Sequence, residues 1–310
     1  MKNNGKQIFH ANGKLLLTAE YLVLKGAKAL ALSLNKGQKL TVHNQESGLS
    51  WKAFNPEGLW FEANFDDDLN LMNDNQSSEA LRLRDILNQV CKINNSTRDL
   101  LKGKSITTEL EFNNNWGWGS SSTLIALLSK WLKTDPYLLL KHTFGGSGYD
   151  IACALNNQAI IYQTIKNQTT VEKVDFDPEF KEHIFFIYSG QKQNSNQEVK
   201  RFTKDSTVSD LVIEEINEIT DLMTSTQSLS EFGRLMHKHE DIISHFVQFK
   251  PLNIEHFSDF KGYTKSLGAW GGDFFMAVTE CNEEYLRNYF QQKGLKTIFS
   301  YKQIVLNTKS

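Results

Sequence analysis

Apolar residues recur at alternate positions in several short stretches of the chain, which is the pattern of half-buried strands. It predicts strands over 7–11, 29–34 and 39–43, and a strand–turn–strand unit over 49–65, whose aromatic residues are separated by Asn, Pro and Gly. The polar stretch 66–78 is predicted to be a loop. Further strands are predicted over 107–112, 159–164, 183–188, 274–279 and 297–305.

Apolar residues three or four positions apart predict helices between these strands. Such faces occur over 79–93, 124–132 and 285–293, and a shorter helix is predicted over 151–155. Two long amphipathic helices follow in the second half, one with Leu211, Ile216, Ile219 and Met223, the other with Leu235, His239, Ile242 and Phe246. Mixed strands and helices with hairpin-like pairs indicate an α+β fold and not a doubly wound parallel sheet.

Composition narrows the class of protein. Of 310 residues, 40% are hydrophobic and 23% are charged, which suits one large globular domain or two ordinary ones. The charged stretch 173–182 separates two predicted strands, so we place a boundary there between an N-terminal domain, 1–175, and a C-terminal domain, 176–310. The formal net charge of -2 gives no general attraction to nucleic acid.

The remaining global features point to a cytoplasmic protein. Cys91, Cys153 and Cys281 lie far apart without metal-ligand spacing and are predicted to be reduced thiols. The polar N-terminal residues lack the apolar core of a signal peptide, and no apolar run approaches the roughly 20 residues that span a bilayer.

The sequence Gly-Trp-Gly-Ser-Ser-Ser at 117–122 follows a predicted strand and opens a predicted helix. Glycines permit close approach of the backbone to a ligand, and a helix N-terminus favours phosphate. Serine hydroxyls can bond phosphate oxygens or a bound magnesium ion. No Gly-Lys-Ser/Thr follows, so this is not the common P-loop. A glycine turn with a serine cap explains the segment equally well when it is taken alone.

Two more glycine loops precede regular elements. Gly-Gly-Ser-Gly-Tyr-Asp at 145–150 leads into a short helix, where the aspartate serves either as a cap or as the group that orients a substrate hydroxyl in phosphoryl transfer. Gly-Ala-Trp-Gly-Gly-Asp at 268–273 precedes an apolar strand and is either an ordinary loop or a close-approach site for a ligand.

Taken in order, the segment Asn-Gly-Lys-Leu-Leu-Leu-Thr-Ala-Glu-Tyr at 12–21 and these three loops resemble the GHMP kinases, which include galactokinase and homoserine, mevalonate and phosphomevalonate kinases. The resemblance covers most of the chain, and Gly-x-Gly-Ser-Ser-Ser is its most specific part. Gly-Ser-Gly-Tyr-Asp-Ile-Ala at 146–152, Gly-Gly-Asp at 271–273 and Tyr-Ser-Gly-Gln-Lys at 188–192 are most similar to the phosphomevalonate kinase branch. The whole is similar to a bacterial group named for its Gly-Tyr-Asp-Ile-Ala signature.

The resemblance implies a fold and an activity. The implied fold is an N-terminal domain like ribosomal protein S5 joined to a ferredoxin-like C-terminal domain. The implied activity is transfer of the γ-phosphoryl group of ATP, with Mg²⁺, to mevalonate or phosphomevalonate in isoprenoid synthesis. The expected partner is this small-molecule substrate, without nucleic acid or membrane, and a homodimer is left open.

The resemblance also implies site residues. The catalytic pair is Asp150 and Lys14. Nucleotide binding falls to Gly117, Gly119, Ser120, Ser121, Ser122, Gly268, Ala269, Gly271 and Gly272, with Ser121 as the magnesium contact. Substrate binding falls to Glu20, Ser147, Gly148 and Lys192.

Departures from the family pattern keep two alternatives open. Asn12 stands for a usual Pro and Ala19 for a common Gly, while Trp118 and Trp270 bring bulky indoles that either reshape the nucleotide pocket or stack on adenine. No clear Glu precedes Gly145 as an acidic magnesium ligand. The alternatives are a kinase-fold regulator that binds ligand without catalysis and an ATP-dependent mevalonate diphosphate decarboxylase.

Other polar residues are assigned structural roles. His239 shares an apolar helix face and is predicted to be a structural histidine and not a metal ligand. Glu240 and Asp241 are predicted to be solvated helix charges. Lys192, Lys200 and Arg201 are either a surface cluster or contacts for an anionic substrate group.

Overall fold

The computed structural model describes residues 5–72, 77–192, 202, 207–247, 249–270 and 272–306. The chain forms two compact units, each built from separate stretches of sequence. Unit 1 comprises Met1–Gly13, Lys36–Asn114 and Trp118–Leu155, and unit 2 comprises Lys14–Asn35, Asn115–Gly117 and Asn156–Ser310. Strands β1 (Gln7–Leu16) and β2 (Ala29–Asn44) contribute residues to both units. The predicted domain boundary at 175/176 stays a prediction.

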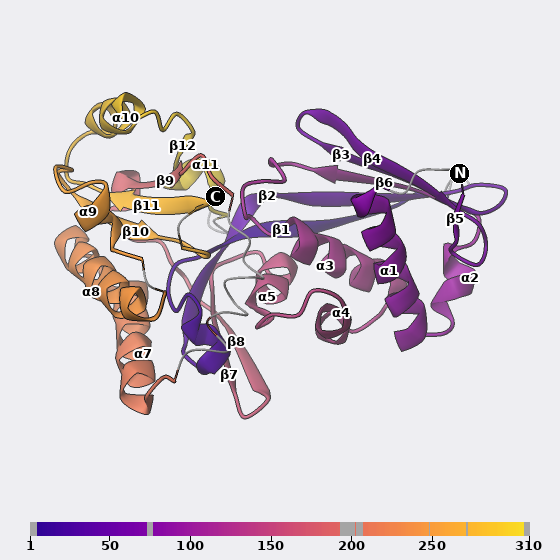
Figure 1. The fold of residues 1–310 in the computed structure, drawn as a ribbon, viewed down its shortest axis with the longest axis horizontal. Coiled ribbons are helices and arrows are strands. Elements are labelled where there is room, and N and C mark those ends of the chain that lie inside the picture. Colours follow the sequence, from indigo (N-terminus) through magenta and orange to yellow (C-terminus); the bar gives the residue numbers. More distant parts are fainter. Residues whose placement is uncertain are drawn as a thin grey trace. The chain divides into compact units, whose positions relative to one another are not determined.

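Unit 1 is a mixed sheet with helices packed along it (Figure 1). Residues 38–44 of β2 pair antiparallel with β6 (Lys104–Leu110), and β6 pairs parallel with β3 (Leu49–Asn55). The antiparallel strands β4 (Gly58–Phe65) and β5 (Leu71–Met72) complete this side. The helices are α1 (Ser78–Ile93), α2 (Thr97–Leu101), α3 (Ser120–Leu132), α4 (Pro136–Thr143) and α5 (Tyr149–Leu155).

The core of unit 1 is formed where the apolar faces of the helices meet alternate residues of the strands. Trp51 and Ile106 of the sheet and Leu83 and Leu128 of the helices belong to one buried cluster. The 3.6-residue and two-residue periods of the sequence therefore converge on one core, as expected for amphipathic elements.

Unit 2 contains a short hairpin and a second sheet. Residues 29–31 of β2 pair with β7 (Ile160–Ile165), and β7 pairs with β8 (Gln168–Lys173). The second sheet is antiparallel with the order β10-β11-β9-β12. Its strands are β9 (Ile184–Tyr188), β10 (Tyr263–Ser266), β11 (Phe274–Val278) and β12 (Ile298–Ser300).

Helices accompany both parts of unit 2. They are α7 (Asp210–Ser225), α8 (Leu229–Val247), α9 (Leu252–Glu255), α10 (Glu283–Gln292) and α11 (Tyr301–Ile304), with 3₁₀ turns η1 (Leu22–Lys25) and η2 (Lys181–His183). Helix α8 packs on α7 and on β10. Throughout the described ranges, no helix combines the length and the apolar character that crossing a membrane requires.

The predicted α+β class is confirmed, with local corrections. The stretch 66–78, predicted to be a loop, contains strand β5. The strands predicted over 29–34 and 39–43 are one strand, β2. The polar run after Leu34 interrupts the apolar alternation, but the backbone continues because Gly37 has no Cβ to collide with the carbonyl oxygen of Ala11 on β1. The strand predicted over 297–305 ends at Ser300, whose capping box with Gln303 starts α11.

Candidate functional site

Residues 118–122 of the Gly/Ser segment lead into α3 in unit 1. Gly119 is the N-cap residue with φ 91°, a left-handed conformation that favours glycine. The first helical hydrogen bond runs from Thr123 N to Gly119 O at 2.9 Å. The N–H groups of Ser120, Ser121 and Ser122 therefore have no partner within the helix and lie at the positive end of its dipole. This arrangement suits a phosphate group.

The serines of this turn have different surroundings. The buried Ser122 hydroxyl donates to Gly119 O at 2.8 Å, so it holds the turn together. Ser120 is half-buried, whereas Ser121 is exposed. The next residue, Thr123, donates through Oγ1 to Gln38 Oε1 on β2 at 2.7 Å. Ser121 is thus the hydroxyl of this turn that solvent reaches most readily, while its neighbours fix the helix start.

The second glycine loop precedes α5, which packs against α3 within unit 1. Gly145 and Gly146 have φ values of 70° and 101°, and a Cβ at either position would meet nothing within 4 Å. The carbonyl of buried Gly148 accepts hydrogen bonds from Ile151 N and Ala152 N. Asp150 lies in the first turn of α5 and is half-buried, as is Ser147. The loop is therefore open around its glycines and anchored at the helix.

Three segments of unit 2 converge around Asp273. Its N–H donates to Gln191 O at 2.7 Å, and its carbonyl accepts from Ser189 N at 2.8 Å. On the other side its carboxylate lies against Gly117, where a Cβ would collide with it. The loops before α3, after β9 and before β11 thus meet within this unit. Asp273 has φ 52°, unusual for a residue with a Cβ.

Neighbouring side chains support the same convergence. Lys192 is exposed and donates from Nζ to Asn115 Oδ1 at 3.2 Å. Trp116 contacts the rings of Phe274 and Phe299 at centroid distances of 5.8 and 5.3 Å. Burial, with the nearby charge of Asp273, raises the pKa of Tyr188 above its usual value. An ammonium group therefore lies at Asn115, two positions before the Gly/Ser segment begins.

The rest of the third loop is placed as follows. Gly268 has φ 67° with open space around its Cβ position, Ala269 is buried and Gly272 is half-buried. Gly271 lies outside the described residues, as do Lys200 and Arg201. In unit 2, Gly272 directly precedes Asp273, whose carboxylate lies against Gly117, whereas 119–122 and 145–150 belong to unit 1.

The first motif lies on β1 and the turn that follows it, and from Lys14 onward it belongs to unit 2. Lys14 is half-buried on the strand. Ala19 and Tyr21 both have φ 62°, so the family's usual Gly at position 19 suits a left-handed conformation that Ala adopts only at some cost. Glu20 between them is fully buried, and its carboxylate accepts from Lys265 Nζ at 2.5 Å. Substrate binding by Glu20 stays a prediction, and the observed partner of its carboxylate is Lys265.

Of the residues around Glu20, sequence reasoning identified His239 as a structural histidine and missed the buried roles of Glu240 and Lys265. Lys265 on β10 and both His239 and Glu240 on α8 have 0% exposure. The prediction that Glu240 is a solvated helix charge is wrong, because Glu240 lies on the same α8 face as Met236 and Ile243, which packs into the core. Asp241 is exposed as predicted. The signal was its spacing, since Glu240 lies four positions after Met236 and three before Ile243, on the apolar face of the helix.

The two departing tryptophans are core residues. Trp118 has 0% exposure and contacts the Phe112 ring at 5.6 Å in unit 1. Trp270 has 1% exposure in unit 2, where its backbone N–H donates to the Tyr21 hydroxyl at 2.9 Å. Neither ring face is presented to solvent, so stacking on adenine is excluded for this conformation. Their bulk acts through packing beneath the loops.

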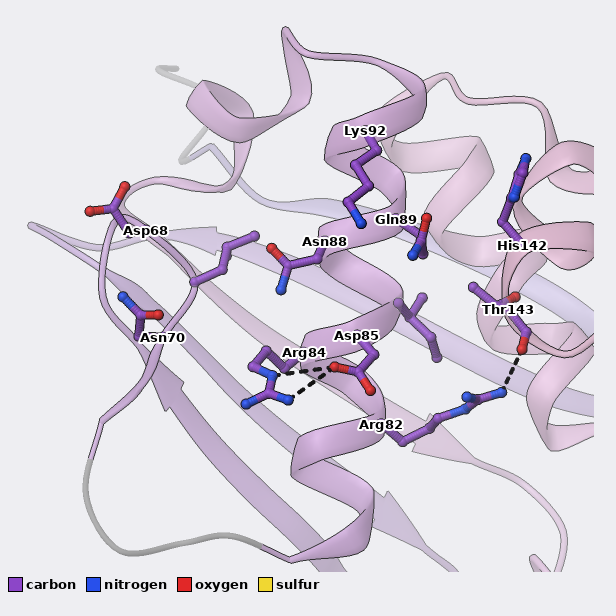
Figure 2. Close-up of a pocket in the computed structure, with 12 residues that line it drawn as sticks. Asp68, Asn70, Arg82, Arg84, Asp85, Asn88, Gln89, Lys92, His142 and Thr143 are labelled. Atoms are coloured by element: carbon purple, nitrogen blue, oxygen red, sulfur yellow. Dashed lines mark hydrogen bonds and ion pairs between the residues drawn. The ribbon is translucent and has the colours of Figure 1, made fainter.

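A separate polar groove of about 540 Å³ lies over α1 in unit 1 (Figure 2). Arg82 donates to Thr143 O at 2.8 Å and lies 4.3 Å from the centroid of the Phe144 ring. Arg84 pairs with its neighbour Asp85 at 3.1 Å. The residues that line this groove include none of the predicted site residues. The groove is therefore distinct from the glycine loops.

Comparison with known proteins supports the fold. No protein-family model and no curated protein matches the sequence. Solved structures do match over nearly their full length. Methanococcus jannaschii mevalonate kinase has a TM-score of 0.70 at 16% identity, covering 98% of this chain and 99% of that chain. Streptococcus pneumoniae phosphomevalonate kinase, in complex with phosphomevalonate and AMPPNP, has a TM-score of 0.71 at 16% identity, covering 95% and 99%.

A sugar kinase belongs to the same set. Lactococcus lactis galactokinase complexed with galactose has a TM-score of 0.64 at 13% identity, covering 97% of this chain and 94% of that chain. The chain therefore has the fold of the GHMP kinases, and the resemblance inferred from its motifs is confirmed at the level of the fold.

Proposed function

We propose that this protein is an ATP-dependent small-molecule kinase of the GHMP type, with mevalonate or phosphomevalonate as acceptor in isoprenoid synthesis. The observation that carries the proposal is the start of α3: a left-handed glycine, three N–H groups without helical partners and an exposed serine form a phosphate-compatible turn. Structures with this fold include kinases for three different acceptors.

In the proposed complex, the α3 turn binds the phosphates of ATP and Asp150 orients the acceptor. Phosphoryl transfer needs positioning and charge neutralisation more than covalent chemistry from the protein. A hydroxyl acceptor attacks the γ-phosphorus, the bond from this phosphorus to the β,γ-bridging oxygen breaks, and the hydroxyl proton passes to Asp150. Lys14 neutralises charge on the transferred group. A phosphate acceptor attacks through an oxygen that is already ionised.

Magnesium fits this scheme through its preference for oxygen ligands. The exposed hydroxyl of Ser121 in the first turn of α3 is the proposed protein contact. When bound with ATP, the ion neutralises charge on the phosphate oxygens.

Lys192 favours phosphomevalonate over an uncharged acceptor. Its ammonium group is exposed and lies beside Asn115, at the base of the Gly/Ser segment. An acceptor that already carries a phosphate needs cations beyond those that serve ATP, and Lys192 supplies one.

The test is ADP release measured with mevalonate, phosphomevalonate, homoserine and galactose in parallel. We expect release with phosphomevalonate or mevalonate alone. Release with none of the acceptors contradicts the proposal and favours a non-catalytic regulator, whereas carbon dioxide release from mevalonate diphosphate identifies a decarboxylase. Lys192→Ala should raise KM for phosphomevalonate and leave KM for ATP unchanged, which separates a substrate contact from a nucleotide contact.

A further inference from the structure

Unit 2 contains a cluster of ionisable side chains sealed from solvent, which we call the Lys265 cluster. Its members are Glu20 after β1, His239 and Glu240 on α8, and Lys265 on β10, each with 0% exposure. Charged groups are rarely buried to this extent, because removing an ion from water costs free energy unless a partner compensates for it.

Each member has a defined contact. Lys265 Nζ donates to Glu20 Oε1 at 2.5 Å and to Ser266 O at 2.9 Å. The Glu240 carboxylate accepts from Ser266 N at 2.5 Å and from Leu252 N at 3.1 Å. Side chains of the Lys265 cluster thus hold both the N–H and the carbonyl of Ser266, the last residue of β10.

His239 is the neutral member. Its Nε2 accepts from the Ala19 N–H at 2.8 Å, which assigns the ring proton to Nδ1. Burial and the nearby charge of Lys265 keep the pKa of His239 well below its usual value, in agreement with this tautomer. Burial raises the pKa of Glu20 to about 7, against the opposing effect of Lys265.

Both ends of the Glu20–Lys265 pair lead directly to the proposed site. Glu20 lies between the left-handed residues Ala19 and Tyr21, at the end of the motif that begins near Lys14. Lys265 lies just before the loop that contains Gly268. The Tyr21 hydroxyl accepts from Trp270 N at 2.9 Å and so joins the two segments a second time.

We propose that the Glu20–Lys265 ion pair is a positioning device that sets the separation of segments 14–21 and 268–270, an inference that rests on the function proposed above. Stability alone does not account for the pair, because replacing a buried ion pair by neutral or apolar side chains of similar size is often neutral or stabilising. A role in holding the segment after β1 at a fixed distance from the segment after β10 does account for the buried pair.

The test uses the double variant Glu20→Gln/Lys265→Met beside the two single variants. Each single variant leaves one buried charge unpaired, so its unfolding midpoint should fall, whereas the double variant should recover most of the loss. If the pair positions the site, kcat of the double variant stays about 100-fold below wild type, because misplacing catalytic groups by about 1 Å has an effect of that size. A double variant with wild-type stability and wild-type kcat overturns the proposal.

A second measurement does not depend on activity. Hydrogen exchange of backbone amides at 266–270 should be faster in the double variant than in wild type, because Ser266 O loses the Lys265 Nζ donor and the segment that follows is held less firmly. If the wild-type protein turns over no acceptor, the proposed function fails, and exchange alone then decides the positioning role. Unchanged exchange rejects it.

Two further variants complete the design. Tyr21→Phe removes the acceptor for Trp270 N and keeps the ring, so it should lower kcat about tenfold and also lower the unfolding midpoint, because a buried N–H loses its acceptor. Tyr21→Phe with wild-type kcat speaks against the positioning role even if the double variant does not fold. Glu283→Gln/Arg287→Met removes an exposed ion pair on α10, with Nη2 2.7 Å from Oε1, and should leave kcat and exchange at 266–270 unchanged.

Discussion

The start of α3 and the end of β10 both carry polar groups next to motif residues, but they hold them in different ways. At α3 the polar groups are backbone N–H groups and one exposed hydroxyl, reached through glycines. At β10 they are the side chains of Glu20, Glu240 and Lys265, with no solvent exposure. The N–H groups at the start of α3 have no partner within the helix and suit a ligand, whereas the side chains at β10 form hydrogen bonds within the protein. The glycine motif therefore lies at the proposed ligand site, and the buried charges form the proposed positioning device.

Asp150→Asn should have the largest effect, because it removes the carboxylate that we propose orients the acceptor and nothing from the buried Lys265 cluster. We expect kcat to fall about 1,000-fold, a loss of about 4 kcal/mol in transition-state stabilisation, with no change in the unfolding midpoint. Coupled ADP release and thermal unfolding measure the two quantities.

A matched control is available in the same unit. Asp135 caps α4 by accepting from Tyr137 N and Leu138 N, and Asn is an equally good cap. Asp135→Asn should leave kcat and stability unchanged. Wild-type turnover by Asp150→Asn would falsify the assignment of its carboxylate to the reaction.

Gly117→Ala and Gly268→Ala compare a crowded glycine with an open one. Their φ values are nearly equal, 65° and 67°, so both variants have the same backbone strain of about 1–2 kcal/mol. Only at position 117 does the new methyl group collide with Asp273, so Gly117→Ala should lose about 2 kcal/mol more in unfolding free energy. Urea unfolding of both variants measures the difference, and equal losses would mean that the contact with Asp273 is not tight.

His239→Gln tests the neutral member of the Lys265 cluster through pH. Because burial lowers the pKa of His239, the unfolded chain binds a proton below about pH 6.5 that the folded chain does not. Wild type should therefore lose up to about 1.4 kcal/mol of unfolding free energy per pH unit below 6.5, relative to the variant. Gln retains an acceptor for the Ala19 N–H without titrating.

The neighbouring carboxyl groups do not change the direction of this difference in stability between wild type and His239→Gln. Glu20 and Glu240 have raised pKa values, so their contribution to stability falls as pH rises, opposite to that of His239. They are present in both proteins and largely cancel in the difference. Parallel stability profiles for wild type and His239→Gln would show that the imidazole does not titrate on unfolding.

The smallest effects are expected for two serine variants. Ser121→Ala tests a role in ligand binding, and Ser122→Ala tests a role in the stability of the turn. Ser121 is exposed, so its loss should leave stability unchanged and raise KM for ATP about fivefold at limiting Mg²⁺, equivalent to about 1 kcal/mol. Ser122→Ala loses the bond to Gly119 O and should lower the unfolding free energy by about 1 kcal/mol. Ser121→Ala kinetics equal to wild type at every Mg²⁺ concentration would remove this residue from the metal site.

Local patterns predicted the elements well where the period was long and clear. The helix predicted over 79–93 is Ser78–Ile93, and the helix predicted after the Gly/Ser segment is α3. Elements without an apolar face were missed, such as β8, in which every residue is exposed. Propensity and periodicity report burial, so an exposed strand has little signal.

The Lys265 cluster was beyond local reasoning for a different reason. Glu20 and Lys265 are 245 positions apart, and a lysine within a strand suggests a solvent-facing position. Their pairing depends on the tertiary structure that encloses them. By contrast, the glycine loops were recognised because a positive φ restricts residue type at each position, which leaves a record in the sequence itself.

The discontinuous units have a consequence for how the polypeptide is made. Unit 1 has all of its residues once Leu155 has left the ribosome, whereas Lys14–Asn35 are synthesised early and join a unit whose remaining strands come last. Glu20 therefore exists without its lysine during most of translation. For the same reason a fragment beginning at residue 176 lacks β7 and the partner of Lys265, so we expect it to be insoluble when it is expressed alone.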